Sequence, residues 1–124
     1  MKLENFNNLI ELFFYQAEKQ DPKSILLQWL NPNNKKSFTW EETKLNIFKL
    51  SKTIKENVKE GDRCLLVSEN RPEWFISDLA IMLSGAITVP AYTTYTDNDY
   101  KYLIEDCEPT VVIVSNNDML KKLN

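Results

Sequence analysis

Polar side chains that could contact a ligand occur in three short loops, each of which follows an apolar stretch. Residues 68–71 read Ser-Glu-Asn-Arg, residues 92–95 read Tyr-Thr-Thr-Tyr, and residues 115–117 read Ser-Asn-Asn. Amide, guanidinium and hydroxyl groups can hydrogen-bond a polar or anionic ligand, but none has an adjacent base that would activate a nucleophile. The candidates for side chains that face a substrate are Asn70, Arg71, Tyr92, Thr93 and Thr94. The other interpretation, which we prefer for all three loops and most strongly for residues 115–117, is that they only turn the chain and cap helices.

The residue types needed for most catalytic sites are missing or isolated. The chain has no histidine, which excludes Ser-His-Asp and Cys-His catalysis and histidine-ligated metals. Its two glycines, Gly61 and Gly85, are too few for either a GxGxxG or a GxxxxGK[ST] phosphate loop. Cys64 and Cys107 match no metal-ligand spacing and are expected to be reduced, buried residues. We therefore predict no catalytic, cofactor-binding or metal-binding residue in this chain.

The elements that must position the loops fall into two groups, the first of which covers residues 9–57. Apolar residues at i, i+3, i+4 and i+7 predict a helix over 9–19. Residues 24–30 and 37–39 are expected to pair as a β-hairpin. The segment Thr39-Trp40-Glu41-Glu42 is a capping box, and the helix that it opens is expected to run to about residue 57.

The second group, residues 63–124, alternates strands and helices in a βαβαβ order. Continuous apolar runs predict strands at 64–67, 86–89 and 110–114, with Pro90 stopping the second. Strands of this kind are typical of a parallel sheet covered on both faces, in which the carboxyl ends share one edge. We predict an α/β fold, namely part of a doubly wound parallel-sheet domain preceded by a short helix and a β-hairpin.

The net charge and the hydropathy of the chain limit which partners and which location are expected. The formal net charge is −3, from 15 basic and 18 acidic residues, so nucleic acid is not an expected partner. No stretch approaches the roughly 20 apolar residues that a transmembrane helix needs. The first residues lack the apolar core of a signal peptide, so a cytoplasmic location is expected. Peripheral contact with a membrane is left open.

Several segments carry a family resemblance. The sequence is similar to AMP-forming acyl-CoA synthetases, and most similar to their long-chain fatty acid–CoA ligase branch. The resemblance covers about residues 9–120 and is strongest in segments that are structural signatures of that family. These segments are Phe38-Thr39-Trp40-Glu41-Glu42, Glu69-Asn70-Arg71-Pro72-Glu73-Trp74, Asp78-Leu79-Ala80-Ile81-Met82, Gly85-Ala86-Ile87-Thr88-Val89-Pro90 and Tyr92-Thr93-Thr94.

The resemblance implies that residues 1–124 are an incomplete N-terminal subdomain, the first lobe of an AMP-binding domain. Complete members use Mg and ATP to convert a carboxylate into an acyl-adenylate, from which the thiol of coenzyme A then displaces AMP. Their phosphate-binding loop and catalytic lysine match no position here, so the segment alone is expected to be inactive. The implied partners are the remainder of the same enzyme and a fatty acid substrate.

Two other interpretations stay open. The parent protein could be a different acid-adenylating ligase, acting on aryl or amino acids, because the matching segments discriminate poorly between branches. The chain could instead be a small stand-alone flavodoxin-like binding module, although such a domain usually has about five strands.

Overall fold

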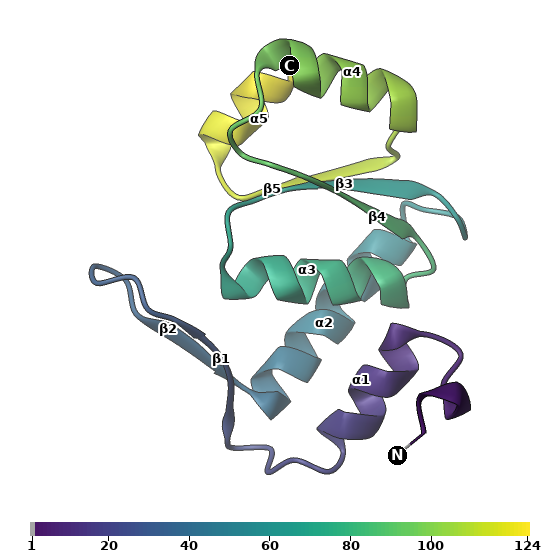
Figure 1. Ribbon diagram of the computed structural model, residues 1–124, viewed down its shortest axis with the longest axis vertical. Coiled ribbons are helices and arrows are strands. Elements are labelled where there is room, and N and C mark those ends of the chain that lie inside the picture. The colour runs from purple at the N-terminus through teal and green to yellow at the C-terminus, as the bar shows by residue number, and fades with distance from the viewer. Residues whose placement is uncertain (1) are drawn as a thin grey trace.

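The computed structural model describes residues 2–124, which form an antiparallel hairpin and a parallel sheet surrounded by helices (Figure 1). In chain order the elements are a 3₁₀ helix (Leu3–Asn5), α1 (Leu9–Ala17), β1 (Ile25–Trp29), β2 (Lys36–Thr39), α2 (Trp40–Lys55), β3 (Arg63–Val67), α3 (Pro72–Leu83), β4 (Ile87–Ala91), α4 (Asp97–Cys107), β5 (Val111–Val114) and α5 (Asn117–Leu123). Within this described range, none of the helices has both the length and the apolar character needed to cross a membrane.

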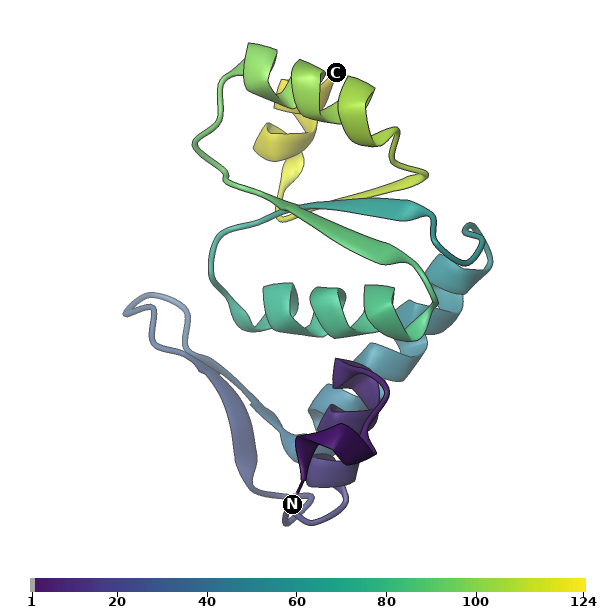
Figure 2. The ribbon, with the colours of Figure 1, turned by 45° about the vertical axis from the view of Figure 1, so that its right-hand side comes forward.

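The parallel sheet has the order β4-β3-β5, with β3 in the centre. Helix α3 covers one face, with α1 and α2 beyond it, whereas α4 and α5 cover the other (Figure 1, Figure 2). The connection from β3 to β4 therefore crosses one face of the sheet, and the connection from β4 to β5 crosses the opposite face. This arrangement confirms the predicted α/β class with a doubly wound parallel sheet.

Strand β3 contributes to two cores because its side chains alternate between the faces of the sheet. Cys64 and Leu66 belong to the cluster formed with α2 and α3, and Leu65 and Val67 belong to the cluster formed with α4. All four side chains are at most 1% exposed. A strand buried on both faces needs apolar residues at every position, which explains its continuous apolar run.

The hairpin and its neighbouring helix form where the sequence predicts them. Strands β1 and β2 pair antiparallel, with Leu27 opposite Phe38, and both side chains pack against the α2–α3 core. The predicted capping box opens α2: Thr39 accepts from the backbone of Glu42, and the Glu42 carboxylate accepts from the backbone of Thr39. Two backbone N–H groups that would otherwise lack a partner are thereby hydrogen-bonded, which defines where the hairpin ends and the helix starts.

Three predicted boundaries are wrong. Strand β4 continues through Pro90, which lies opposite Leu66, because β4 is an edge strand and one row of its N–H groups needs no partner. Helices α1 and α2 end at Ala17 and Lys55, two residues earlier than expected. Just beyond each end the hydrogen bonds change to the tighter 3₁₀ spacing, because the amides of Lys19 and Asn57 donate to carbonyls three residues back.

The two cysteines are free thiols with different environments. Cys64 is buried, whereas Cys107 is only half-buried, which corrects the prediction that both are core residues. Cys107 is the last residue of α4. Burial is the main factor that raises the pKa of both thiols, so they stay protonated at neutral pH.

Thr43, on the buried side of α2, supplies a test of the core. Its hydroxyl is fully buried and has no hydrogen-bond partner among the described residues. We expect Thr43→Val to raise the free energy of unfolding by about 1 kcal/mol, because the methyl group removes an unsatisfied polar atom at similar volume. Urea unfolding measures this effect. The control is Thr53→Val, whose exposed hydroxyl already donates to the carbonyl of Lys49 and which should bring no gain.

Candidate functional site

The three polar loops predicted from the sequence start side by side. Val67 at the end of β3 lies opposite Ala91 on β4 and opposite Val114 on β5. The strands therefore stop level with one another, and their following loops share the carboxyl edge of the sheet. In open α/β sheets this edge is the ligand-binding edge.

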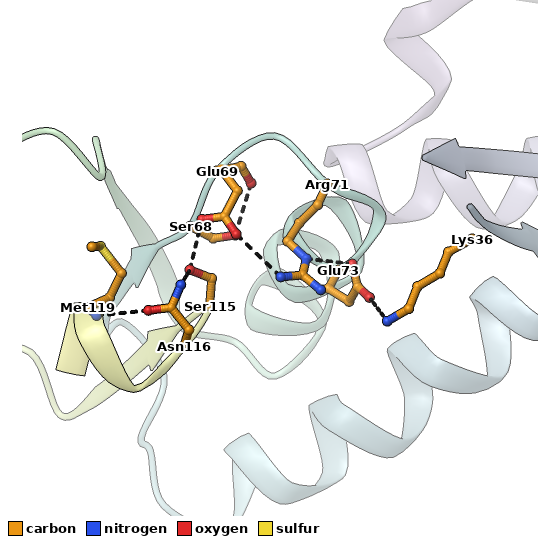
Figure 3. Close-up of polar contacts among 8 residues, drawn as sticks. All are labelled: Lys36, Ser68, Glu69, Arg71, Glu73, Ser115, Asn116 and Met119. Atoms are coloured by element: carbon orange, nitrogen blue, oxygen red, sulfur yellow. Dashed lines mark hydrogen bonds and ion pairs between the residues drawn. The ribbon is translucent and has the colours of Figure 1, made fainter. Parts of the chain in front are cut away.

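A chain of polar contacts runs along this edge from β5 to the hairpin (Figure 3). The Ser115 hydroxyl donates to Glu69 over 2.9 Å, and Arg71 donates to Glu69 over 3.3 Å. Arg71 also donates to Glu73 over 2.9 Å, and Lys36 of the hairpin donates to the other oxygen of Glu73 over 3.1 Å. We call these five residues the edge brace.

Arg71 is the centre of the edge brace. Its guanidinium lies 4.8 Å above the ring of Trp29 in β1 while its nitrogens bind two carboxylates. Although it occupies the N-cap position of α3, its side chain makes no capping hydrogen bond. Arg71 thus joins the hairpin to the loop after β3, and its charge is already neutralised. This geometry favours a positioning role over direct ligand contact.

Most of the edge brace was not predicted from the sequence. The alternation Glu69-x-Arg71-x-Glu73 was a visible signal, because opposite charges two residues apart can pair where the chain is extended. Lys36 and Trp29 gave no such signal, since the Lys36–Glu73 pair joins residues 37 positions apart.

Asn70 and Tyr92 lie together at a shallow hollow between the ends of β3 and β4. The hollow has a volume of about 260 Å³ and is lined by Ser68, Asn70, Trp74, Pro90, Ala91 and Tyr92. Asn70 is exposed and its amide forms no side-chain hydrogen bond within residues 2–124, so it is free to bind a ligand. Tyr92 is 71% exposed at the rim. The structure therefore brings two of the five predicted residues together.

Thr93 and Thr94 follow Tyr92 in the same loop but do not line the hollow. The carbonyl of Thr93 accepts from Lys122 of α5 over 3.4 Å. Arg71 lines a separate hollow of about 210 Å³ on the α3 face, beside Ser77 and Ser115. The five predicted residues are thus distributed along one edge and do not form a single pocket.

The position of Tyr92 is held by Tyr100 of α4. Tyr100 is 1% exposed, and its hydroxyl donates to the carbonyl of Tyr92. We expect Tyr100→Phe to lower the free energy of unfolding by about 1 to 2 kcal/mol, because the carbonyl loses its partner. Urea unfolding measures the loss, and amide hydrogen exchange at Thr93 and Thr94 should rise. Tyr102→Phe, on the exposed side of the same helix, should change neither.

The carboxylates of the brace make stability depend on pH. Burial raises the pKa of Glu73, but hydrogen bonds from Arg71, its own backbone and Lys36 outweigh burial and hold it at about 2, against an ordinary 4.5. A lowered folded-state pKa means that the stabilisation is complete above the unfolded value and is lost as pH falls towards the folded one. The pKa of Glu69 is also lowered: burial raises it, while its backbone, Ser115 and Arg71 lower it more.

We therefore expect the stability difference between the unmodified chain and Glu73→Gln to shrink as pH falls from about 4.5 to about 2. Urea unfolding at a series of pH values measures it. A difference that stayed constant across this window would contradict the ion pairs assigned to Glu73. The control is Glu105→Gln, whose pair with Lys101 is exposed and 4.0 Å long.

The chemistry open to this edge is binding and orientation. Within residues 2–124, no group of three or more His, Cys, Asp or Glu side chains is placed to hold a metal ion. The brace carboxylates are tied to cations, so their lowered pKa values make them poor proton donors or acceptors near neutral pH. The parallel sheet and the polar loops at its carboxyl edge define an α/β fold of the class that binds ligands at this edge.

The chain belongs to the AMP-binding enzyme family, whose sequence profile matches residues 13–124. This membership confirms the resemblance seen in the sequence. The chain is 30% identical over 104 residues to the long-chain-fatty-acid–CoA ligase FadD15 of Mycobacterium tuberculosis, which is 83% of this chain and 17% of that protein. It is 26% identical over 102 residues to the human mitochondrial acyl-coenzyme A synthetase ACSM3, covering 80% of this chain and 17% of that protein. The chain thus spans less than a fifth of these relatives.

Solved structures share the fold. The fatty acid AMP ligase of Legionella pneumophila superimposes with a TM-score of 0.79 at 21% identity, over 98% of this chain and 22% of that one. The anthranilate CoA ligase AuaEII, in complex with anthranoyl-AMP, gives a TM-score of 0.81 at 21% identity, over 99% of this chain and 23% of that one. At these identities the likeness establishes the fold and not the substrate.

Proposed function

We propose that this chain is the N-terminal part of an ATP-dependent long-chain fatty acid–CoA ligase. The complete enzyme would use Mg and ATP to form an acyl-adenylate and coenzyme A to release the acyl-CoA. The observation that carries the proposal is the family match over residues 13–124, together with a relative named as a long-chain ligase at 30% identity. A cytoplasmic location remains a prediction.

The role of this part would be to build one wall of the approach to the active site. Asn70 and Tyr92 line the hollow between β3 and β4, and Thr93 and Thr94 continue the same edge towards α5. These side chains present an amide, a ring and hydroxyls, which suit contact with an acyl group or with coenzyme A. The grip on the phosphates of ATP would come from the remainder of the enzyme, because this chain holds no phosphate loop.

A second candidate is an aryl-acid ligase of the same family. The observation that favours it is the likeness to an anthranilate CoA ligase, which has a TM-score as high as that of the fatty acid AMP ligase. Both candidates share adenylate formation and differ only in the acid. The acid is therefore what an experiment has to decide.

The test starts by reading the gene beyond the codon for Asn124 and expressing the longer protein that we expect it to encode. ATP–pyrophosphate exchange is then measured with palmitate, anthranilate and a panel of amino acids. We expect exchange with palmitate, and none by residues 1–124 alone. Exchange with anthranilate but not with palmitate would mean that the substrate is an aryl acid and not a fatty acid. Exchange by the 124-residue chain alone would refute the proposal that it needs a remainder.

Variants of the longer protein test the wall itself. Tyr92→Ala should raise KM for the acid or for coenzyme A about fivefold, the effect of losing about 1 kcal/mol of contact. The control is Tyr102→Ala, since Tyr102 is 69% exposed on α4 and does not line the hollow. Equal KM values for the two variants would show that Tyr92 does not contact the acid or coenzyme A.

A further inference from the structure

The order of the strands reverses between β3 and β5. From β3 the chain passes to β4 on one side of it, and then returns to β5 on the other side. The helices that follow the two strands, α3 after β3 and α5 after β5, lie on opposite faces of the sheet (Figure 1, Figure 2). In open α/β sheets the crevice at such a switch point is where ligands bind. This crevice is distinct from the hollow of Asn70 and Tyr92, which lies between β3 and β4.

A hollow of about 210 Å³ lies at this switch point, between α3 and the carboxyl ends of β3 and β5. Leu66 and Ile113, which are opposite each other in the β3–β5 pair, give it an apolar wall. Ser68 after β3, Ser77 in α3 and Ser115 after β5 bring a hydroxyl group from each of three segments. The hollow therefore combines apolar surface with several hydroxyl groups in a small volume.

Ser77 has the one hydroxyl of these three that the fold leaves without a partner. Its residue is only 6% exposed and lines the hollow, and it forms no side-chain hydrogen bond within residues 2–124. The hydroxyls of Ser68 and Ser115 instead donate to the carbonyl and to the carboxylate of Glu69. Because buried hydroxyl groups are normally hydrogen-bonded by protein, water or ligand, Ser77 is available both to donate and to accept.

The charges beside this hollow cancel. Arg71 and Glu73 line it, and both belong to the edge brace. The brace contains two cations, Lys36 and Arg71, and two carboxylates, Glu69 and Glu73, so its net charge is zero. A charged ligand would have to leave water without finding an unpaired opposite charge, which is unfavourable. The electrostatics of the hollow therefore favour a neutral ligand.

We propose that the hollow at the switch point binds a small neutral polyhydroxylated molecule, that is, a monosaccharide or a polyol. A hydroxyl group of such a ligand can accept from Ser77 and donate to the oxygen of Ser68, while its C–H groups pack against Leu66 and Ile113. The volume of about 210 Å³ is below that of pockets for drug-sized molecules, which limits the ligand to a single small unit. This inference rests on the geometry of residues 2–124 and holds whether or not the proposed function does.

The experiment is a titration of the nitrogen-15-labelled 124-residue chain followed by amide NMR. The probe is D-xylose, compared with tetrahydropyran, which has the same ring without hydroxyl groups, and with acetate and methylammonium as charged probes. We expect saturable shifts at the amides of Ser68, Ser77 and Ser115 with D-xylose, at a millimolar Kd, and at least about fivefold weaker binding of the other probes.

Three results would overturn the proposal. The first is no saturable shift with D-xylose, or shifts confined to Asn70 and Tyr92, which would place the sugar in the other hollow. The second is equal binding of tetrahydropyran, which would make the hollow an apolar site. The third is tighter binding of acetate or methylammonium, which would mean that the ligand is charged.

Matched variants locate the contact. Ser77→Ala deletes the unpartnered hydroxyl and should weaken the binding of D-xylose about fivefold or more. The control is Ser51→Ala, because Ser51 is 5% exposed on α2, also forms no side-chain hydrogen bond within the described range, and does not line the hollow. It should leave the Kd unchanged. Circular dichroism checks that both variants are folded. Equal Kd values for the two variants would overturn the assignment to Ser77.

Discussion

Replacing Leu66 by alanine is expected to lower the free energy of unfolding by about 2 to 5 kcal/mol, a large share of the stability of a domain of this size. Leu66 is 1% exposed in the central strand and packs in the cluster with α2 and α3. The change removes buried apolar atoms and leaves a cavity that the surrounding strands and helices can only partly close. Because β3 pairs with both other strands of the sheet, a loss here weakens every loop at the carboxyl edge.

Urea unfolding followed by circular dichroism measures this loss. The control is Leu45→Ala, which deletes the same atoms from a side chain that is 51% exposed, and it should cost less than about 0.5 kcal/mol. Similar losses for the two leucines would mean that β3 is not the core strand. In the longer protein, Leu66→Ala should reduce the amount of folded enzyme more than the activity per folded molecule.

Replacing Arg71 by alanine is expected to cost about 1 to 3 kcal/mol, between the values for an exposed and a buried ion pair. Arg71 has a side chain only 18% exposed, whereas Glu69 and Glu73 are 42% and 37% exposed, so solvent screens part of the interaction. The variant leaves Glu69 and Glu73 without their shared partner and removes the contact with Trp29. It should also free the hairpin and the loop that carries Asn70.

The measurements are urea unfolding and amide hydrogen exchange in β1 and β2, which should rise. Arg71→Lys keeps the charge but loses the planar, two-sided geometry, so an intermediate loss is expected. Lys101→Ala breaks the exposed pair with Glu105, whose side chains are 73% and 67% exposed, and should cost less than about 0.5 kcal/mol. If Arg71→Ala were as stable as Lys101→Ala and amide hydrogen exchange in β1 and β2 did not change, the edge brace would not stabilise the hairpin.

These two variants separate the parts of the proposed role. Leu66 supports the sheet as a whole, whereas Arg71 ties one loop of its carboxyl edge to the hairpin. If the loop with Asn70 is a wall of the active site, Arg71→Ala in the longer protein should raise KM beyond what its stability loss explains. Leu66→Ala should not, once the folded fraction is taken into account.

The sequence by itself determined the local elements and their order. A capping box at Thr39 depends on two residues three positions apart, and the apolar run of β3 reflects burial on both faces, so each is encoded within a few positions. The resemblance to the family was also visible in short segments, among them the one from Phe38 to Glu42. The end of β4 was missed because proline is tolerated only when the strand lies at an edge, and the position of a strand in its sheet is a non-local property.

Only the tertiary structure decided what the loops do. It placed Arg71 over the ring of Trp29 and in the edge brace with Glu73, and it placed Asn70 and Tyr92 at one hollow. The Ser115–Glu69 hydrogen bond spans 46 positions, and it forms because β3 and β5 pair side by side and end level with one another. Local sequence patterns predict which backbone groups are satisfied by nearby residues. Side chains far apart in the sequence come into contact only when the whole fold has formed.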